Sequence, residues 1–156
     1  SHKIPVLSLC DTPGFMVGPE AEGAGQVKQS CRLFVQGANL TVPFFAVVLR
    51  KAYGLGAQAM VGGSFHAPIF AVSWPTGEFG AMGFEGAVRL GFRKELEAIT
   101  DLDAREAFFQ ERLKELYEEN KALTVAEYME VDDVIDPAET RGWIIQGFEA
   151  ASRGRP

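Results

Sequence analysis

Residues 42–60, VPFFAVVLRKAYGLGAQAM, decide the fold of this chain. Residues 42–49 are almost continuously apolar, which is typical of a strand in a parallel sheet that helices cover on both faces. Two cations, a tyrosine and two glycines follow, and residues 56–61 predict a short helix that ends at Gly62-Gly63. A strand that passes through glycines into a helix exposes backbone amides. Such amides suit a phosphate, a dinucleotide or a carbonyl oxygen that becomes an oxyanion.

Elements of the same kind flank this unit. An apolar run predicts a strand over residues 4–10, which the turn Asp-Thr-Pro-Gly at residues 11–14 ends, and residues 69–74 predict another strand. The glycine-rich residues 15–25 predict a loop. Apolar residues at helical spacing predict helices over residues 26–39, 83–90 and 101–120.

The last third of the chain is more highly charged, and it predicts helices. Thr124 and Glu127 have the spacing of a capping box, and Asp136, with Pro137 and Glu139 after it, predicts a second helix start. Strands that alternate with helices indicate an α/β fold. We therefore expect parallel strands flanked by helices, with a charged helical extension over about residues 100–156.

Composition narrows the class of protein. The 156 residues are 47% apolar and 23% charged, as expected for one globular domain with a sizeable core. The net charge of -6 argues against nucleic acid as a partner. No apolar run approaches the roughly 18 residues of a membrane span, and the N-terminus does not resemble a signal peptide.

Cysteine and histidine are scarce. Cys10 and Cys31 predict reduced thiols in a cytoplasmic protein rather than a disulfide framework. His2 and His66 are too few for a zinc site, so we predict no metal. The chain lacks an initiator methionine and enters a strand within four residues, so we expect it to be one domain of a longer protein.

The turn at residues 11–14 also resembles the magnesium-binding element of GTPases. That fold needs a Gly-x-x-x-x-Gly-Lys-[Ser/Thr] loop around the phosphates, and this sequence has none. The residues Asn120-Lys121-Ala122-Leu123 also lack the acid of a guanine-binding motif. We therefore reject the interpretation of this chain as a GTPase.

A dinucleotide site is the second interpretation of the glycines. Gly54, Gly56 and Ala59 satisfy a relaxed Gly-x-Gly-x-x-[Gly/Ala] pattern, and Glu78 follows at the distance of a ribose-binding acid. Against this, residues 51–53 separate the glycines from the predicted strand, and the helix is short for a crossover. The pattern by itself is weak evidence.

An oxyanion hole is the third interpretation. Backbone amides at a strand end and in the first helical turn can point at one oxygen, assisted by the helix dipole. Two such places exist, at Gly14-Phe15 and at Leu55-Gly56-Ala57, and parallel strands would bring both to one edge of the sheet. Simple tight turns remain the alternative for each single glycine.

Four motifs together resemble a known family. In order they are Asp11-Thr12-Pro13-Gly14-Phe15, Val48-Leu49-Arg50-Lys51-Ala52-Tyr53-Gly54, Trp74-Pro75-Thr76-Gly77-Glu78 and Met82-Gly83-x-Glu85-Gly86-Ala87. From about Val6 to Leu90 the chain resembles the C-terminal half of the β-type carboxyltransferase of biotin-dependent acyl-CoA carboxylases, which act on propionyl-CoA or acetyl-CoA. The resemblance implies a crotonase-like fold, biotin on a carrier protein and a coenzyme A thioester as substrate.

The resemblance also implies a mechanism and partners. In the family an N-terminal half holds the acyl-CoA, the C-terminal half holds carboxybiotin, and the carboxyl group passes to the α-carbon of the thioester. Biotin carboxylase and biotin carrier domains complete the enzyme, and subunits associate. We therefore expect this chain to self-associate and to be inactive alone.

Particular residues follow from the same resemblance. The biotin-side oxyanion hole falls on backbone amides between Tyr53 and Gln58, aided by Gly14 and Phe15. The family commonly reads Tyr-Gly-Gly-Ala-Tyr where this chain reads Tyr53-Gly54-Leu55-Gly56-Ala57. The donors are therefore either Leu55 and Gly56 or Gly56 and Ala57, with Gly54 in the turn. Without a gap, a position that tunes acyl-chain choice falls on Gln58.

Several interpretations remain open from the sequence. Arg50 and Lys51 either gather an anionic ligand or extend from a strand end into solvent. The chain could also belong to a decarboxylase or hydratase of the same superfamily, which would act without biotin. A non-catalytic assembly module of a carboxylase complex is a further alternative.

Overall fold

A parallel sheet forms the centre of the molecule. The computed structural model describes residues 2–153, so Ser1 and residues 154–156 of the predicted domain lie outside the described residues. The strands are β1 (Val6–Thr12), β2 (Phe44–Tyr53), β3 (Phe70–Ser73), β4 (Glu78–Gly80) and β5 (Asp133–Val134). Their order is β1-β2-β3-β5, and β4 also pairs with β2. Every one of these pairings is parallel, which confirms the predicted α/β class.

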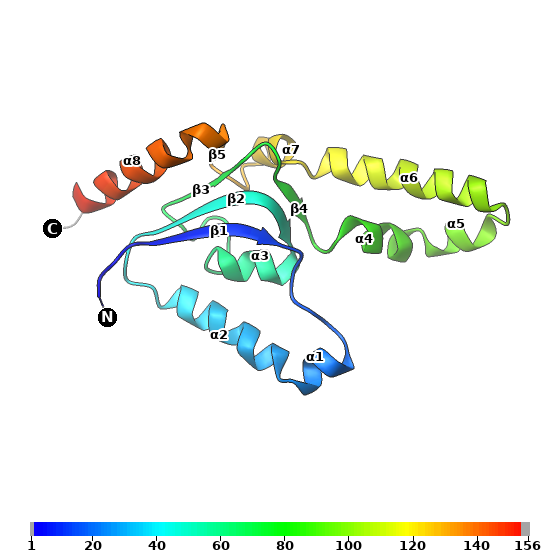
Figure 1. Ribbon diagram of the computed structural model, residues 1–156, viewed down its shortest axis with the longest axis horizontal. Helices are drawn as coiled ribbons and strands as arrows, with labels where there is room; N and C mark the ends of the chain where they lie inside the picture. The colour runs from blue at the N-terminus through cyan, green and yellow to red at the C-terminus, as the bar shows by residue number, and fades with distance from the viewer. Residues whose placement is uncertain (1, 154–156) are drawn as a thin grey trace.

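Helices cover the sheet and extend beyond it. They are α1 (Pro19–Gly23), α2 (Gln26–Ala38), α3 (Gly54–Met60), α4 (Phe84–Gly91), α5 (Arg93–Ala98), α6 (Leu102–Glu119), α7 (Ala122–Glu127), a 3-10 turn (Pro137–Glu139) and α8 (Thr140–Arg153). In Figure 1, α2 and α3 lie on one side of the sheet and α8 on the other. Helices α4, α5 and α6 project sideways as an arm.

Strand β2 is buried on both faces, as its apolar run predicts. Phe45 and Val47 pack on the α8 side with Phe70 and Val72 of β3. The alternate residues Ala46 and Val48 are also fully buried, and they belong to clusters that include residues of α3 and the segment after it. Because the side chains of a strand alternate between its faces, this one strand joins two separate cores.

Helix α8 packs closely on the sheet through a glycine. A Cβ at Gly147 would lie 2.6 Å from Cε1 of Phe70 and 2.9 Å from Cε1 of Phe45. The ring of Phe70 also meets Trp143 of the same helix edge to face, with centroids 5.6 Å apart. A larger residue at position 147 would therefore press on two core rings.

The structure confirms most predicted elements and changes some boundaries. The helix from Gln26, the helix over residues 101–120 and the Asp136 cap are present, and the Asp136 carboxylate accepts the N–H of Ala138 at 2.8 Å. Strand β2 continues four residues beyond the predicted end because β4 pairs with Lys51, Ala52 and Tyr53. Helices α1 and α5 and strands β4 and β5 are too short to show a clear periodicity in sequence.

The predicted capping box is wrong. Helix α7 begins at Ala122 with Lys121 as its N-cap, so Thr124 lies inside the helix. The Thr124 hydroxyl instead donates to the carbonyl of Glu118, at 3.0 Å.

No helix within the described residues is long and apolar enough to cross a membrane.

We predict opposite effects for two glycine substitutions in α8. Gly147→Ala should lower the free energy of unfolding by about 1–3 kcal/mol because it overpacks the core. The matched control Gly142→Ala has open space around its Cβ position, so it should be neutral or stabilise by up to about 1 kcal/mol through helix propensity. Urea unfolding measures both, and equal stabilities would contradict the packing of α8.

We predict that the two thiols react at very different rates. Cys10 is fully buried and Cys31 is exposed. Burial, and secondly the charge of Asp11, raise the pKa of the Cys10 thiol to about 11. At pH 8 iodoacetamide should therefore alkylate Cys31 and spare Cys10 until the protein is unfolded, because the thiolate is the nucleophile. Peptide mass spectrometry follows both residues, and equal rates would show that Cys10 is accessible.

Candidate active site

The two predicted glycine turns touch each other at the carboxyl edge of the sheet. A Cβ at Gly56 would lie 2.7 Å from the Cα of Gly14 and 3.2 Å from the amide nitrogen of Phe15. Gly14 has a φ of +104°, which few other residues adopt, and its own Cβ position lies 3.4 Å from the carbonyl oxygen of Tyr53. The structure therefore brings together backbone segments that are about 40 residues apart in the chain.

Helix α3 begins directly at the end of β2. Tyr53 is its N-cap with extended backbone, and no side chain caps this end. Gly54 has a φ of +56°, and a Cβ there would lie 2.7 Å from the carbonyl oxygen of Ala81. In a helix that starts at Gly54, the amides of Gly54, Leu55 and Gly56 have no acceptor within the helix. The first turn of α3 therefore presents backbone donors.

The β1 turn has fewer free donors than predicted. The amide of Gly14 donates to the hydroxyl oxygen of Thr12 at 3.2 Å. Among the amides of this turn, that of Phe15 lies beside Gly56. Phe15 is therefore a better candidate donor than Gly14, whose part is to allow the close approach.

Two crevices lie on either side of Gly54. The first, of about 370 Å³, is lined by Pro13, Gly14, Phe15, Val17, Tyr53, Gly54, Leu55, Ala81 and Met82. The second, of about 300 Å³, includes Ala57 and Gln58 together with Phe65, Phe79 and Asn120. Gly54 and Ala81 line both. The structure thus separates Gln58 from Leu55, and it buries Gly56 at the contact between the turns.

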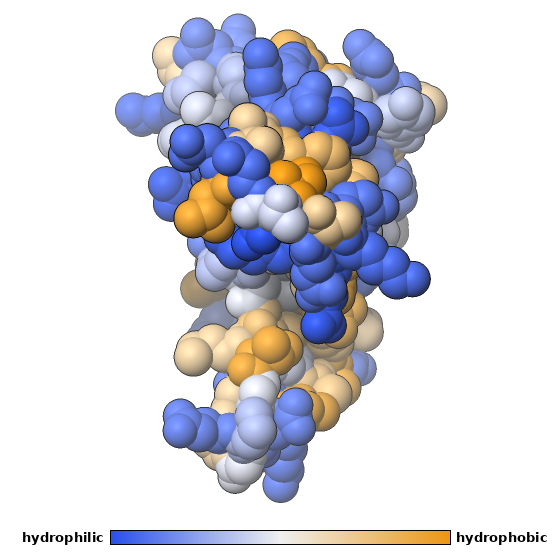
Figure 2. Space-filling view, turned by 90° about the vertical axis from the view of Figure 1, so that its right-hand side faces the viewer, coloured by the Kyte–Doolittle hydropathy of each residue, from blue (hydrophilic) through white to orange (hydrophobic). Residues whose placement is uncertain are grey.

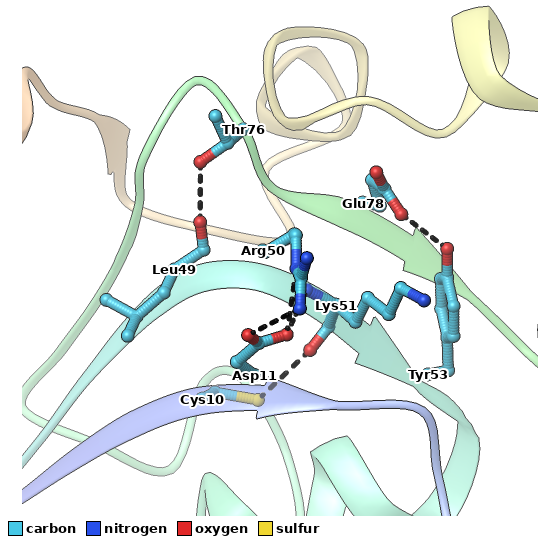
Figure 3. Close-up of polar contacts among 8 residues, drawn as sticks. All are labelled: Cys10, Asp11, Leu49, Arg50, Lys51, Tyr53, Thr76 and Glu78. Carbon is cyan, nitrogen blue, oxygen red and sulfur yellow. Dashed lines mark hydrogen bonds and ion pairs between the residues drawn. The ribbon is translucent and has the colours of Figure 1, made fainter.

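A bulge in β2 positions this edge of the sheet. Cys10 pairs with Val48 and Thr12 with Ala52, so β2 has two more residues than β1 between these pairs. The Asp11 carboxylate lies opposite the bulge, where it accepts the Lys51 amide at 3.1 Å and pairs with the Arg50 guanidinium at 3.1 Å (Figure 3). The Lys51 amide and then Arg50 lower the pKa of Asp11, against the opposing effect of partial burial.

Thr76 supports the bulge from the other side. Its hydroxyl donates to the Leu49 carbonyl (Figure 3). Before this point β2 pairs with β3, and from Lys51 onward it pairs with β4. Sequence reasoning missed both Asp11 and Thr76 in this role, although each lies in a motif that it identified. Arg50 pairs with Asp11, and its side chain is 59% exposed at this edge of the sheet.

A buried tyrosine continues the network toward α3. The Tyr53 hydroxyl donates to the Glu78 carboxylate at 2.6 Å (Figure 3), and the Tyr53 ring packs against Phe84 with centroids 5.1 Å apart. Burial, and then Glu78, raise the pKa of Tyr53, which keeps the phenol protonated. Glu78 therefore anchors the N-cap residue of α3.

These contacts revise the argument about a dinucleotide. Strand β2 runs to Tyr53, so Gly54 follows the strand directly. The prediction that residues 51–53 separate the glycines from the strand is therefore wrong. Helix α3 is nevertheless short, with seven residues, and the Glu78 carboxylate already accepts a hydrogen bond from the Tyr53 hydroxyl. Both observations argue against a dinucleotide site.

Within residues 2–153 no group of three or more His, Cys, Asp or Glu side chains could hold a metal ion.

Comparison with known proteins identifies the family. The family model of the carboxyl transferase domain matches residues 1–155 of this chain. The carboxyltransferase subunit of propionyl-CoA carboxylase from Haloferax mediterranei is 40% identical over 147 residues, which are 93% of this chain and 28% of that subunit. The chain thus spans less than a third of this relative.

Solved structures agree with the sequence match. A single-chain, multi-domain long-chain acyl-CoA carboxylase is 55% identical, with a TM-score of 0.80 over 92% of this chain and 14% of the other. The transcarboxylase 12S hexamer is 35% identical, with a TM-score of 0.85 over 99% of this chain and 29% of the other. These likenesses confirm the crotonase-like fold that the four motifs imply. The chain belongs to the carboxyl transferase domain family.

Proposed function

We propose that this chain is the biotin-facing, C-terminal half of a carboxyltransferase that moves a carboxyl group from carboxybiotin to the α-carbon of an acyl-CoA. The family match and the relatives named for propionyl-CoA and long-chain acyl-CoA support this reaction class. The observation that carries the proposal is the contact of Gly56 with Gly14, which lines a crevice together with Leu55.

Leu55 and Gly56 are the proposed amide donors. In a helix with Tyr53 as its N-cap, the amide of Ala57 is the first that has an acceptor, the carbonyl of Tyr53. Regular helix geometry thus favours the pair Leu55 and Gly56 over the pair Gly56 and Ala57. Phe15 would add a third amide from the β1 turn, and Gly54 allows the turn into α3 through its φ of +56° and its close contact with Ala81.

The walls of the crevice fit a neutral ring that develops negative charge on one oxygen. None of the lining residues has an ionisable group free to compete, since the phenol of Tyr53 is bonded to Glu78. Fixed amides in apolar surroundings stabilise such charge more strongly than water does. When bound, carboxybiotin would supply the carboxyl group, and a biotin nitrogen would take up the substrate proton.

The proposed assembly follows the relatives. We propose that an N-terminal carboxyltransferase half, biotin carboxylase and a biotin carrier act with this chain, and that subunits associate as in the 12S hexamer. Reduced Cys10 and Cys31 suit a cytoplasmic enzyme. The relatives act on acyl groups of different lengths, so the acyl chain that is used depends on the walls of the site.

A biotin-dependence assay tests the reaction class. We expect the complete carboxylase that contains this domain to carboxylate an acyl-CoA only when a carboxybiotinylated carrier is supplied, and we expect the 156-residue chain alone to be inactive. Radiolabelled bicarbonate measures product formation. Turnover of the thioester without biotin would indicate a decarboxylase or hydratase. An inactive complete enzyme whose domain still binds the carrier would indicate an assembly module.

Substitution of Gly56 tests the amide site. In the complete enzyme, Gly56→Ala should lower kcat by about 10²–10³-fold, because a Cβ 2.7 Å from Gly14 would force the two turns apart. Gly86→Ala is the control, since nothing lies within 4 Å of its Cβ position. Circular dichroism and the melting temperature check that both variants fold. A folded Gly56→Ala enzyme with full kcat would refute the site.

A further inference from the structure

Residues 78–84, from β4 into α4, surround the point where β2 becomes α3. In the sheet Gly80 pairs with Tyr53, the last residue of β2. The carbonyl oxygen of Ala81 lies 2.7 Å from the Cβ position of Gly54, the first residue of α3. The backbone of this segment therefore fits closely against the start of the helix that carries the proposed donor amides.

Two side chains of the same segment hold Tyr53, the N-cap of α3. The Glu78 carboxylate accepts a hydrogen bond from the Tyr53 hydroxyl at 2.6 Å, and the Phe84 ring packs against the Tyr53 ring with centroids 5.1 Å apart. Phe84 in turn meets the ring of Tyr117 in α6 edge to face, with centroids 4.8 Å apart. Both ends of the Tyr53 side chain are thus in contact with the segment.

The segment is itself packed from outside the sheet. A Cβ at Gly80 would lie 2.8 Å from Cε1 of Phe84, so the chain after β4 folds back closely on this ring. On the other edge of β4, the amide of Phe79 donates to the carbonyl of Asn120 at 2.9 Å. Strand β4 is therefore held between β2 and the junction of α6 with α7.

The arm of α4, α5 and α6 supports Phe84. Phe84 and Val88 of α4 are buried, as is Phe109 of α6. Figure 2 views the molecule from the tip of the arm, and its upper half is mainly hydrophilic, as expected for helices that bury these side chains between them. A packed interior makes the arm a firm support for the ring that contacts Tyr53.

The start of α3 depends on this support because no side chain caps it. Leu55 and Gly56 follow Tyr53 within one helical turn, so a shift of Tyr53 would move both proposed donor amides. Groups that stabilise a transition state must keep their position to within about 0.5 Å. A misplacement of about 1 Å can lower a rate about 10²-fold.

We propose that Glu78 and Phe84 are positioning residues that hold the proposed donor amides in place through Tyr53. This inference rests on the proposed function. Neither Glu78 nor Phe84 is among the described residues that line the two crevices beside Gly54, so both act through Tyr53 and not on a ligand. The part of Glu78 is to accept a hydrogen bond, not to transfer a proton.

Substitutions of Glu78 in the complete carboxylase test this role. The probe is whichever of acetyl-CoA, propionyl-CoA and palmitoyl-CoA the wild-type enzyme carboxylates fastest from a carboxybiotinylated carrier. Glu78→Ala should lower kcat about tenfold or more and leave KM for the thioester within about twofold, because the amides act on the transition state. Glu78→Gln retains an acceptor oxygen, so its kcat should stay within about threefold of wild type.

Removal of the Tyr53 hydroxyl completes a double-mutant cycle. Tyr53→Phe should lower kcat as much as Glu78→Ala does, and the double variant should lose no more than either one, because both changes remove the same bond. Tyr53→Phe removes a single oxygen, so it decides the question even if Glu78→Ala does not fold. Tyr128→Phe is the matched control, since Tyr128 is 77% exposed, and its kcat should equal that of wild type.

Phe84 is compared with another buried ring of the arm. Phe84→Leu should lower kcat about threefold or more at an unchanged KM, because the Tyr53 ring loses its support. Phe109→Leu should lower the melting temperature as well, but its kcat should stay within about twofold of wild type. Sedimentation checks that both variants assemble.

Three results would overturn the inference and leave the proposed function intact. The first is full kcat in a folded Glu78→Ala or Tyr53→Phe enzyme. The second is a loss in Glu78→Gln as large as that in Glu78→Ala, which would make Glu78 an acid or a base. The third is an equal loss of kcat in Phe84→Leu and Phe109→Leu. A wild-type enzyme that carboxylates none of the three thioesters would overturn the proposed function itself, and the inference with it.

Discussion

Strand β2 must satisfy its backbone hydrogen bonds on both sides over ten residues, and the candidate site depends on how it does so. On one side it pairs with β1 from Phe44 to Val48 and again at Ala52, whereas on the other side it pairs first with β3 and then with β4. A bulge at the change of partner leaves backbone groups that Asp11 and Thr76 bond from opposite sides. The last three residues of β2 pair with β4, and the Tyr53 carbonyl lies beside Gly14 of the β1 turn.

Close backbone contact at this edge explains why the proposed chemistry needs few side chains. The two turns leave no room for a Cβ at Gly56, so amides from separate segments can lie near one oxygen. Tyr53 and Glu78 hold the residue from which α3 starts. Amides fixed in this way need little reorganisation as charge develops. That accounts for a proposed active site built from glycines and poor in histidine.

The sequence by itself determined the α/β class, the buried strand, the long helices and the Asp136 cap, because these follow from local periodicity and local hydrogen bonds. It also determined that glycines would follow two neighbouring strands. Only the tertiary structure decided that β2 continues to Tyr53 beside β4, that Asp11 bonds the bulge, and that Thr124 lies inside a helix. These outcomes depend on residues distant in the chain, and a pattern read along one segment contains no information about which distant backbone group will need a partner.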